Sequence, residues 1–194
     1  MRKLRVLALA PAILVLSLAA CAGAKLSEDK AKERAEGYDA AAVVEKYASV
    51  EVTTKVDVKK NTGVFADDGL MAAYVKTIKA QAGTEKEEGD DLAEYVWDAK
   101  MGEMYEQMGE GYSVTYYSYK SKGLKVEVKI DAEVEETGMK QTSKGTANTF
   151  ILDDGRMEKG DSNMKMTVSG SYGGVTLEGE LEYTMSMTAK WTAK

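Results

Sequence analysis

Sulfur is the element with which this chain could do chemistry, because the 194 residues include no histidine and a single cysteine. Two methionine pairs, Met164 with Met166 and Met185 with Met187, are spaced so that each pair shares one face of a strand. Paired thioethers are ligands that Cu(I) prefers. The same spacing arises wherever methionine fills the core of a sheet. With no histidine or second thiol to complete a copper site, the pattern favours core packing, and Cu(I) stays a third choice.

Paired carboxylates are the other groups to consider, at Asp67-Asp68, Asp90-Asp91 and Asp153-Asp154. Acid–base catalysis needs two such groups in one cleft with separated pKa values. Each pair lies beside glycine or before an expected helix, where aspartate serves turns and caps. Histidine, the commonest general base, is missing. No glycine-rich phosphate loop, metal-ligand spacing or nucleophile elbow is visible. The sequence therefore predicts no catalytic residues, no cofactor, no resident metal and no enzyme.

The one thiol, Cys21, follows a leader. Residues 1–5 are basic, and residues 6–18 are apolar apart from Ser17. Thirteen residues are too few to cross the roughly 30 Å core of a bilayer as a helix, so the stretch indicates a secretory signal. It ends in Leu18-Ala19-Ala20-Cys21, which resembles the lipobox of bacterial lipoprotein precursors. An ordinary secretory signal with an incidental cysteine is the alternative.

The lipobox resemblance implies that residues 1–20 are a signal peptide and that Cys21 receives a diacylglycerol after cleavage. The new amino group is usually acylated as well in that family. Two or more acyl chains hold a protein durably on a membrane. The resemblance therefore implies a bacterial cell-envelope protein that is lipid-anchored through Cys21. Ala22 at the next position implies the outer membrane rather than the inner one if the host is Gram-negative.

The charge of the chain limits its partners. Without the three basic leader residues, 23 of the 26 Lys and Arg remain against 32 Asp and Glu. Such an acidic chain is a poor ligand for nucleic acid, and its net charge does not favour docking on anionic lipid. Only Arg34 and Arg156 remain as arginines, which disfavours bidentate phosphate binding. Disulfides are excluded, so the fold must be stabilised by a hydrophobic core. The sequence names no protein partner.

The expected domains are a lipidated, flexible, charged tether over residues 21–37 and a single globular domain over residues 38–194. Asp39 is expected to cap a short helix. Residues 70–82 favour a helix over a strand. Residues 91–108 predict another helix with two apolar stripes, which is either buried core broken near Gly102 or a lid between the sheet and something else. The lid candidates are Trp97, Met101, Met104 and Met108.

Strands fill the rest of the chain. Residues 124–134 and 175–191 alternate apolar and polar side chains without a break, and residues 139–152 and 156–169 do so less regularly. The fold class predicted is α+β: a strongly curved, half-barrel-like antiparallel sheet of about six to seven long strands, covered by two or three short helices. The side chains expected to line a ligand site on its concave face are Val126, Val128, Ile130, Met164, Met166, Val168, Leu177, Leu181, Tyr183, Met185 and Met187.

This order of elements, most closely over residues 42–58 and 149–189, resembles the half-barrel of the LolA/LppX-like lipoprotein group. Members of that group carry acylated or otherwise apolar cargo in a hollow under helical lids. The resemblance implies a lipid-anchored envelope protein that binds an apolar or lipid-like ligand in the concave face. The alternative is a structural or partner-binding surface lipoprotein with a filled core and no ligand.

Overall fold

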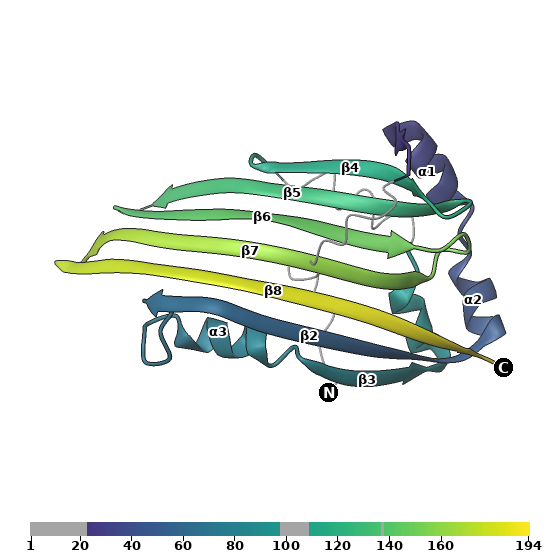
Figure 1. Cartoon of the computed structure of the whole chain (residues 1–194), viewed down its shortest axis with the longest axis horizontal. Coiled ribbons are helices and arrows are strands. Elements are labelled where there is room, and N and C mark those ends of the chain that lie inside the picture. Colours follow the sequence, from purple (N-terminus) through teal and green to yellow (C-terminus); the bar gives the residue numbers. More distant parts are fainter. Residues whose placement is uncertain (1–22, 98–108, 137) are drawn as a thin grey trace.

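The computed structural model describes residues 23–97, 109–136 and 138–194, and it confirms the α+β prediction. An eight-stranded antiparallel sheet, which does not close into a barrel, carries four short helices (Figure 1). In the described part of the chain, no helix has the length and apolarity needed to cross a membrane.

The strand order is β1-β4-β5-β6-β7-β8-β2-β3. Strands β4 to β8 form a continuous meander, and β2 returns to pair with β8 along most of its length. The sequence predicted the long strands β5 to β8, and β8 runs to Ala193, beyond the predicted end at residue 191. The bounds are β1 Lys25–Leu26, β2 Tyr47–Gly63, β3 Gly83–Glu88, β4 Tyr112–Tyr119, β5 Gly123–Glu136, β6 Met139–Ile151, β7 Met157–Tyr172 and β8 Val175–Ala193.

Alternation along the strands separates an apolar inner face from a polar outer face. In β8, Leu181, Tyr183 and Met185 are at most 4% exposed, whereas Glu182 is exposed between them. Successive side chains of a strand point to opposite faces, so the apolar set meets the helices and the polar set meets water. We call these the inner face and the outer face.

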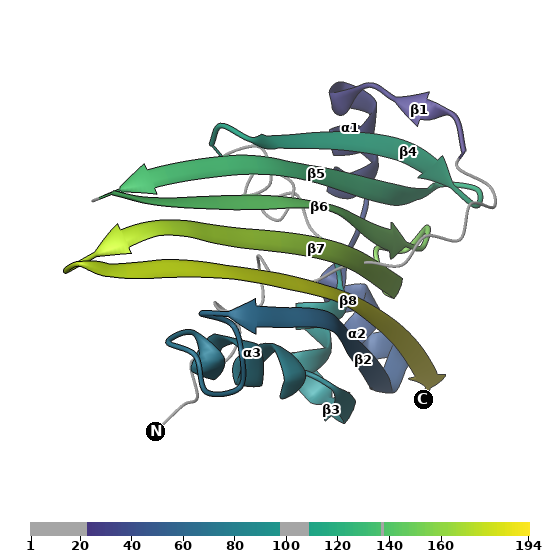
Figure 2. The same cartoon turned by 60° about the vertical axis from the view of Figure 1, so that its left-hand side comes forward.

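The helices stand at both edges of the sheet. Figure 2 shows α1 (Glu28–Glu36) beside β1 and β4, and α2 (Ala40–Lys46) and α3 (Ala72–Lys79) beside β2 and β3. The 3-10 helix η1 (Gly89–Tyr95) packs on α2. The side chain of Asp39 caps α2 by accepting from Ala42 N at 3.1 Å, as predicted. The preference for a helix over residues 70–82 is likewise confirmed.

The core consists of three apolar clusters on the inner face. Ala31 and Ala35 of α1 pack on β4, β5 and β6. Val75 and Ile78 of α3, together with Phe65, pack on β7 and β8. The third cluster joins α2 and η1 to the ends of β2 and β8. Removing buried apolar surface from water, at about 25 cal/mol per Å², is what holds the helices on the sheet.

The structure differs from the prediction at residues 25–36, which are not a solvated tether. Leu26 lies in β1, which pairs with β4, and Ser27 caps α1 by accepting from Lys30 N. The two alanines of α1 are spaced by four residues and are at most 5% exposed. Small side chains let a charged helix approach the sheet closely, so the segment packs although it lacks large apolar residues.

Two further elements differ. The helix predicted from Asp91 ends at Tyr95, since Val96 forms a β-bridge with Arg156 and Trp97 N donates to Gly155 O at 2.8 Å. The turn between β6 and β7 thus supplies the partners that a continued helix would have used. The acidic composition of residues 83–89 predicts a loop, and this prediction is wrong, because residues 83–88 form β3 against β2.

Candidate functional site

The side chains predicted to line a ligand site do share the inner face, but the helices cover most of them. Eight are at most 8% exposed, and only Ile130, Met164 and Leu177 are partly exposed. Trp97, the one lid candidate within the described residues, is 2% exposed in the cluster under α1; Met101, Met104 and Met108 lie outside the described residues. The buried eight are Val126, Val128, Met166, Val168, Leu181, Tyr183, Met185 and Met187.

In the C-terminal half of β5, the helices no longer cover the inner face of the sheet. Leu124, the first inner-face residue of β5, is 0% exposed, whereas Val134, ten residues further, is 58% exposed. Ile130 and Ala132 lie between them and are half-buried. Tyr112, opposite Ile130 on β4, is 40% exposed. We name this surface the inner strip, and it consists of Tyr112, Ile130, Ala132, Val134 and Met164.

The pairing of β5, β6 and β7 places Met164 of β7 in the same row as Ile130, within the inner strip. Ile130 pairs with Gly145 of β6, and Gly145 pairs with Met164. A Cβ at Gly145 would lie 2.4 Å from the Met164 sulfur, so the thioether occupies the space that glycine leaves free. Because methionine is unbranched and flexible, it can move to fit an irregular apolar molecule at that point.

Uncharged polar groups border the inner strip. Ser143 and Gln141 of β6 lie opposite Ala132 and Val134. From α3, Tyr74 directs its hydroxyl at the sulfur of Met166, 3.5 Å away. Burial raises the pKa of Tyr74, while its hydrogen bond with Tyr183 acts in the opposite sense. Burial also raises the pKa of Tyr183, so both phenols are neutral at physiological pH.

The inner strip therefore offers apolar contact and hydrogen bonds but no charge. None of its five residues is Asp, Glu, Lys or Arg, and its border supplies hydroxyl and amide groups. It also holds no nucleophile with an adjacent base, which covalent catalysis would need. The chemistry that this arrangement supports is the binding of a molecule with a hydrocarbon part.

The four methionines considered for copper do not converge. In the β7–β8 register, Met166 lies opposite Leu181 and Met187 lies opposite Gly160. These two positions are six residues apart along the strands, or about 20 Å. Met164 and Met185 are nearer neighbours, but they pack in a cluster with Tyr183. Among the described residues, no group of three or more His, Cys, Asp and Glu is placed to hold a metal.

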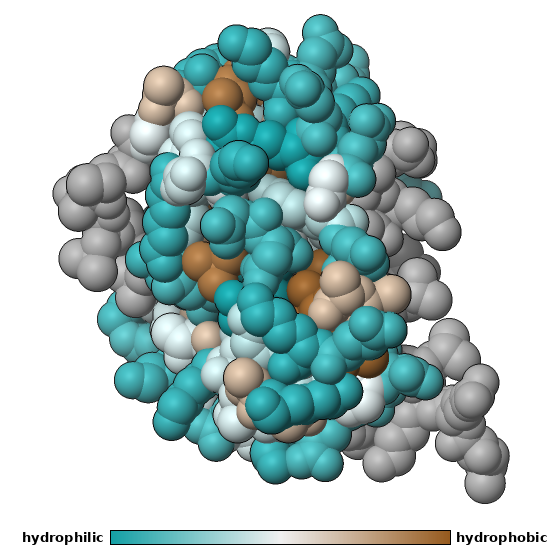
Figure 3. All heavy atoms as spheres, turned by 90° about the vertical axis from the view of Figure 1, so that its right-hand side faces the viewer, coloured by the Kyte–Doolittle hydropathy of each residue, from teal (hydrophilic) through white to brown (hydrophobic). Residues whose placement is uncertain are grey.

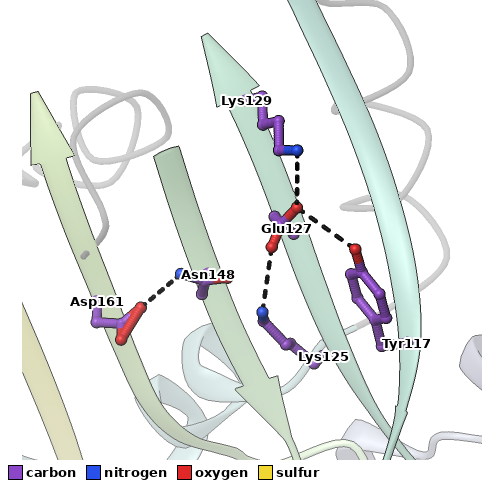
Figure 4. A network of polar contacts seen from close by, with 6 residues as sticks. All are labelled: Tyr117, Lys125, Glu127, Lys129, Asn148 and Asp161. Carbon is purple, nitrogen blue, oxygen red and sulfur yellow. Dashed lines mark hydrogen bonds and ion pairs between the residues drawn. The ribbon is translucent and has the colours of Figure 1, made fainter. Parts of the chain in front are cut away.

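The outer face carries a polar network across β4 to β7 (Figure 4). Glu127 accepts from the Tyr117 hydroxyl at 3.5 Å and from Lys125 Nζ at 3.2 Å. In the next two strands, Asn148 Nδ2 donates to Asp161 Oδ1 at 2.8 Å, and both of these side chains are at most 9% exposed. The hydrogen bonds from Tyr117 to Glu127 and from Asn148 to Asp161 each join two neighbouring strands, and such cross-strand contacts stabilise a sheet. We assign this network to sheet stability.

Two of the three aspartate pairs, Asp67-Asp68 and Asp153-Asp154, lie in turns as predicted, whereas Asp90-Asp91 lie inside η1 and do not cap it. Asp154, in the turn between β6 and β7, accepts from Arg156 Nε at 2.8 Å. The Arg156 guanidinium lies over the ring of Tyr47, 4.1 Å from its centroid, and also faces Trp191. This arrangement ties the start of β7 to β2 and β8.

The end of the molecule that bears α1, α2 and the C-terminus is mostly hydrophilic, with only small separate apolar spots (Figure 3).

Sequence reasoning missed Tyr112, Ala132 and Val134 as site residues. Alternation along the predicted strand over residues 124–134 puts Ala132 and Val134 on the same face as Ile130, but only Ile130 was expected to line the site. Tyr74 was predicted on a helix, without a role in the site.

Comparisons with protein-family models, with curated proteins and with solved structures give no match for this chain.

Proposed function

We propose that this protein is a lipid-anchored protein of the bacterial cell envelope that binds an apolar or lipid-like ligand on the inner strip. The lipobox-like residues 18–21 support the anchor, and acyl chains on Cys21 would hold the domain at a membrane. The observation that carries the ligand proposal is the exposure of the inner strip, where Val134 is 58% and Tyr112 40% exposed next to eight inner-face side chains that are at most 8% exposed.

Exposed apolar side chains that adjoin one another on a concave wall are characteristic of binding sites rather than of ordinary surface. The border of hydroxyl and amide groups would orient the ligand by hydrogen bonds. No charged side chain within the strip would have to lose its hydration when an acyl chain is bound. These properties favour an uncharged or weakly polar amphiphile.

The test uses the full chain as the Cys21→Ser variant, which cannot be acylated. Native mass spectrometry of this protein purified from a bacterial envelope is expected to show co-purified amphiphile. A fluorescent fatty acid, with a fluorescent monoacylglycerol as its uncharged counterpart, measures uptake. A ligand-free mass together with no uptake of either probe contradicts the proposal.

A matched pair of variants locates the ligand. Val134→Glu places a carboxylate in the inner strip and is expected to weaken monoacylglycerol binding at least about ten-fold, because the charge must be desolvated. Val175→Glu makes the same change at the tip of the β7–β8 hairpin, where valine is 60% exposed, and is expected to leave binding unchanged. Equal affinities for the two variants would place the ligand elsewhere.

The alternative function is a partner-binding surface lipoprotein with a filled core. It is favoured by the eight inner-face side chains that are at most 8% exposed under the helices. In that case, the exposed tyrosines Tyr74 and Tyr112 would contact a protein. The Cys21→Ser variant would then purify free of amphiphile, and Tyr112→Ala would abolish capture of one specific envelope protein.

A further inference from the structure

The first described residues lie directly against the edge of the sheet. Ser118 N, in β4, donates to Ala24 O at 2.9 Å. Gly23 approaches so closely that a Cβ there would lie 1.9 Å from Ser118 O. Arg34 of α1 binds the same place, donating to Ser118 Oγ at 3.0 Å and to Gly123 O at 2.9 Å. The start of the domain is thus fastened to β4 by backbone and side-chain contacts.

Covalent geometry then limits how far Cys21 can be from this edge. Two residues span at most roughly 7 Å from Cα to Cα, and Gly23 is two residues after Cys21. Acyl chains on Cys21 would therefore hold β4 next to the lipid headgroups. A long flexible tether would have left the orientation of the domain free.

The inner strip begins on the same edge strand. Tyr112 is the first residue of β4 and lies six residues before Ser118, about 20 Å along the strand. Strand β1 pairs only with Tyr116 and Tyr117, so no described strand lies on the free side of residues 112–115. As far as the described residues show, the strip therefore opens at the edge that carries Gly23.

Charge distinguishes this edge from the opposite one. Residues 23–38 and 112–125 together carry seven basic and four acidic side chains, although the whole chain has a net charge of −6. Residues 83–97, which contain β3 and η1, carry six acidic side chains and one basic one. An anionic lipid surface attracts nearby lysines by about 1 kcal/mol each and repels carboxylates.

From these observations, we propose that the β1–β4 edge faces the bilayer that holds the anchor, and that the ligand enters the inner strip directly from that bilayer. This inference rests on the proposed function. A membrane lipid would reach Tyr112 and Ile130 by lateral movement across the headgroups, without passing through water. The partner surface is an anionic bilayer, and the ligand source is the same membrane.

The orientation is tested with the acylated full chain in vesicles that contain phosphatidylglycerol and a nitroxide-headgroup lipid. Acylation removes the one native thiol, so an introduced cysteine is labelled alone. Ser113→Cys on β4 and Thr84→Cys on β3 are matched, since both replace exposed polar residues near the start of an edge strand. A fluorophore at position 113 is expected to be quenched at least about three-fold more than one at position 84. Equal quenching, or stronger quenching at position 84, overturns the orientation.

Entry from the bilayer is tested by inserting twenty Gly and Ser residues between Ala22 and Gly23. Uptake of pyrene-labelled diacylglycerol from the anchoring vesicle is expected to slow at least about ten-fold. The Cys21→Ser protein with and without the insert should bind the monoacylglycerol probe equally. If the insert leaves uptake unchanged, bilayer entry is wrong while the binding function stands. If the Cys21→Ser protein binds no amphiphile, the proposed function itself fails.

Discussion

The two edges of the sheet differ in how they are protected from pairing with another chain. An edge strand exposes unpaired backbone groups to which another chain can add. Strand β3 is short, and four of its six residues are charged. At the other edge, β4 has no charged residue and is covered over only part of its length by β1 and α1. The comparison indicates that charge protects the β3 edge from strand addition, whereas part of the β4 edge is uncharged and has no described strand beside it.

The largest expected effect tests whether packing holds the β4 edge. Leu124→Ala empties a fully buried position under α1 and is expected to cost about 3 kcal/mol of unfolding free energy, within the 2–5 kcal/mol typical of such changes. Glu85→Ala on the exposed β3 edge should change stability by less than about 0.5 kcal/mol. Urea denaturation measures both variants. Similar losses for the two would show that the edges are held alike.

Reversing one charge at each edge tests the electrostatic difference. In the Cys21→Ser background, Lys122→Glu changes the local charge by two units and is expected to weaken adsorption to phosphatidylglycerol vesicles by about 2 kcal/mol at low salt. Lys86→Glu on β3 makes the same change and should leave adsorption nearly unaltered. Co-sedimentation measures both. The prediction is wrong if Lys86→Glu weakens adsorption as much as Lys122→Glu does.

A smaller effect is expected when the fastening of α1 is loosened. Arg34→Met removes the hydrogen bonds to Ser118 and Gly123 and leaves a carbonyl acceptor without that donor, at a cost of about 1–2 kcal/mol. Lys30→Met, on the exposed side of the same helix, is the control. Thermal unfolding compares their stability. Hydrogen exchange should show faster exchange of α1 amides only in the Arg34 variant; unchanged exchange there would contradict the assignment.

The smallest effect concerns the acidic edge itself. Burial raises the pKa of Glu87, and Asp91, Glu85 and Glu94 raise it further. A carboxyl group with a raised folded-state pKa favours folding when protonated, and this contribution is lost as the pH rises through that pKa. Glu87→Gln stays neutral, so it should stabilise the fold at pH 7 by no more than about 0.5 kcal/mol, given solvent screening. The gain should vanish at acidic pH, and thermal unfolding between pH 4 and pH 7 measures it.

Much of the fold follows from local pattern. Alternation predicted β5 and β8 because each must keep one face dry, and the helical spacing of Ala73, Thr77 and Ile78 predicted α3. Strand β3 could not be predicted in this way. Its residues are nearly all polar, and it is a strand because β2 offers it hydrogen bonds. Segment 25–36 was missed because two alanines, not large apolar residues, make its contact.

The sequence predicted on which face of the sheet the candidate site lies, but not which part of that face is exposed. Register and alternation place Ile130 and Met164 on the same side as the buried wall, and the structure agrees. Which part of that wall stays uncovered depends on where α1 and α3 end in space, and no neighbouring residue in the sequence encodes this. The inner strip is therefore a property of tertiary packing, while its uncharged and largely aliphatic character follows from the residue types of the strands.

The strand order also separates the two ends of the domain. The described chain begins at β1 on one edge, and its last strand, β8, lies five places away. With neighbouring strands about 4.8 Å apart, this is a sideways step of roughly 24 Å. Lys194 is pinned there through its hydrogen bonds to Lys46 and Val44. In the proposed orientation, with the β1–β4 edge on a bilayer, anything fused to the C-terminus would stand off from that bilayer by a distance set by the width of the sheet, so the domain would serve as a fixed-length spacer.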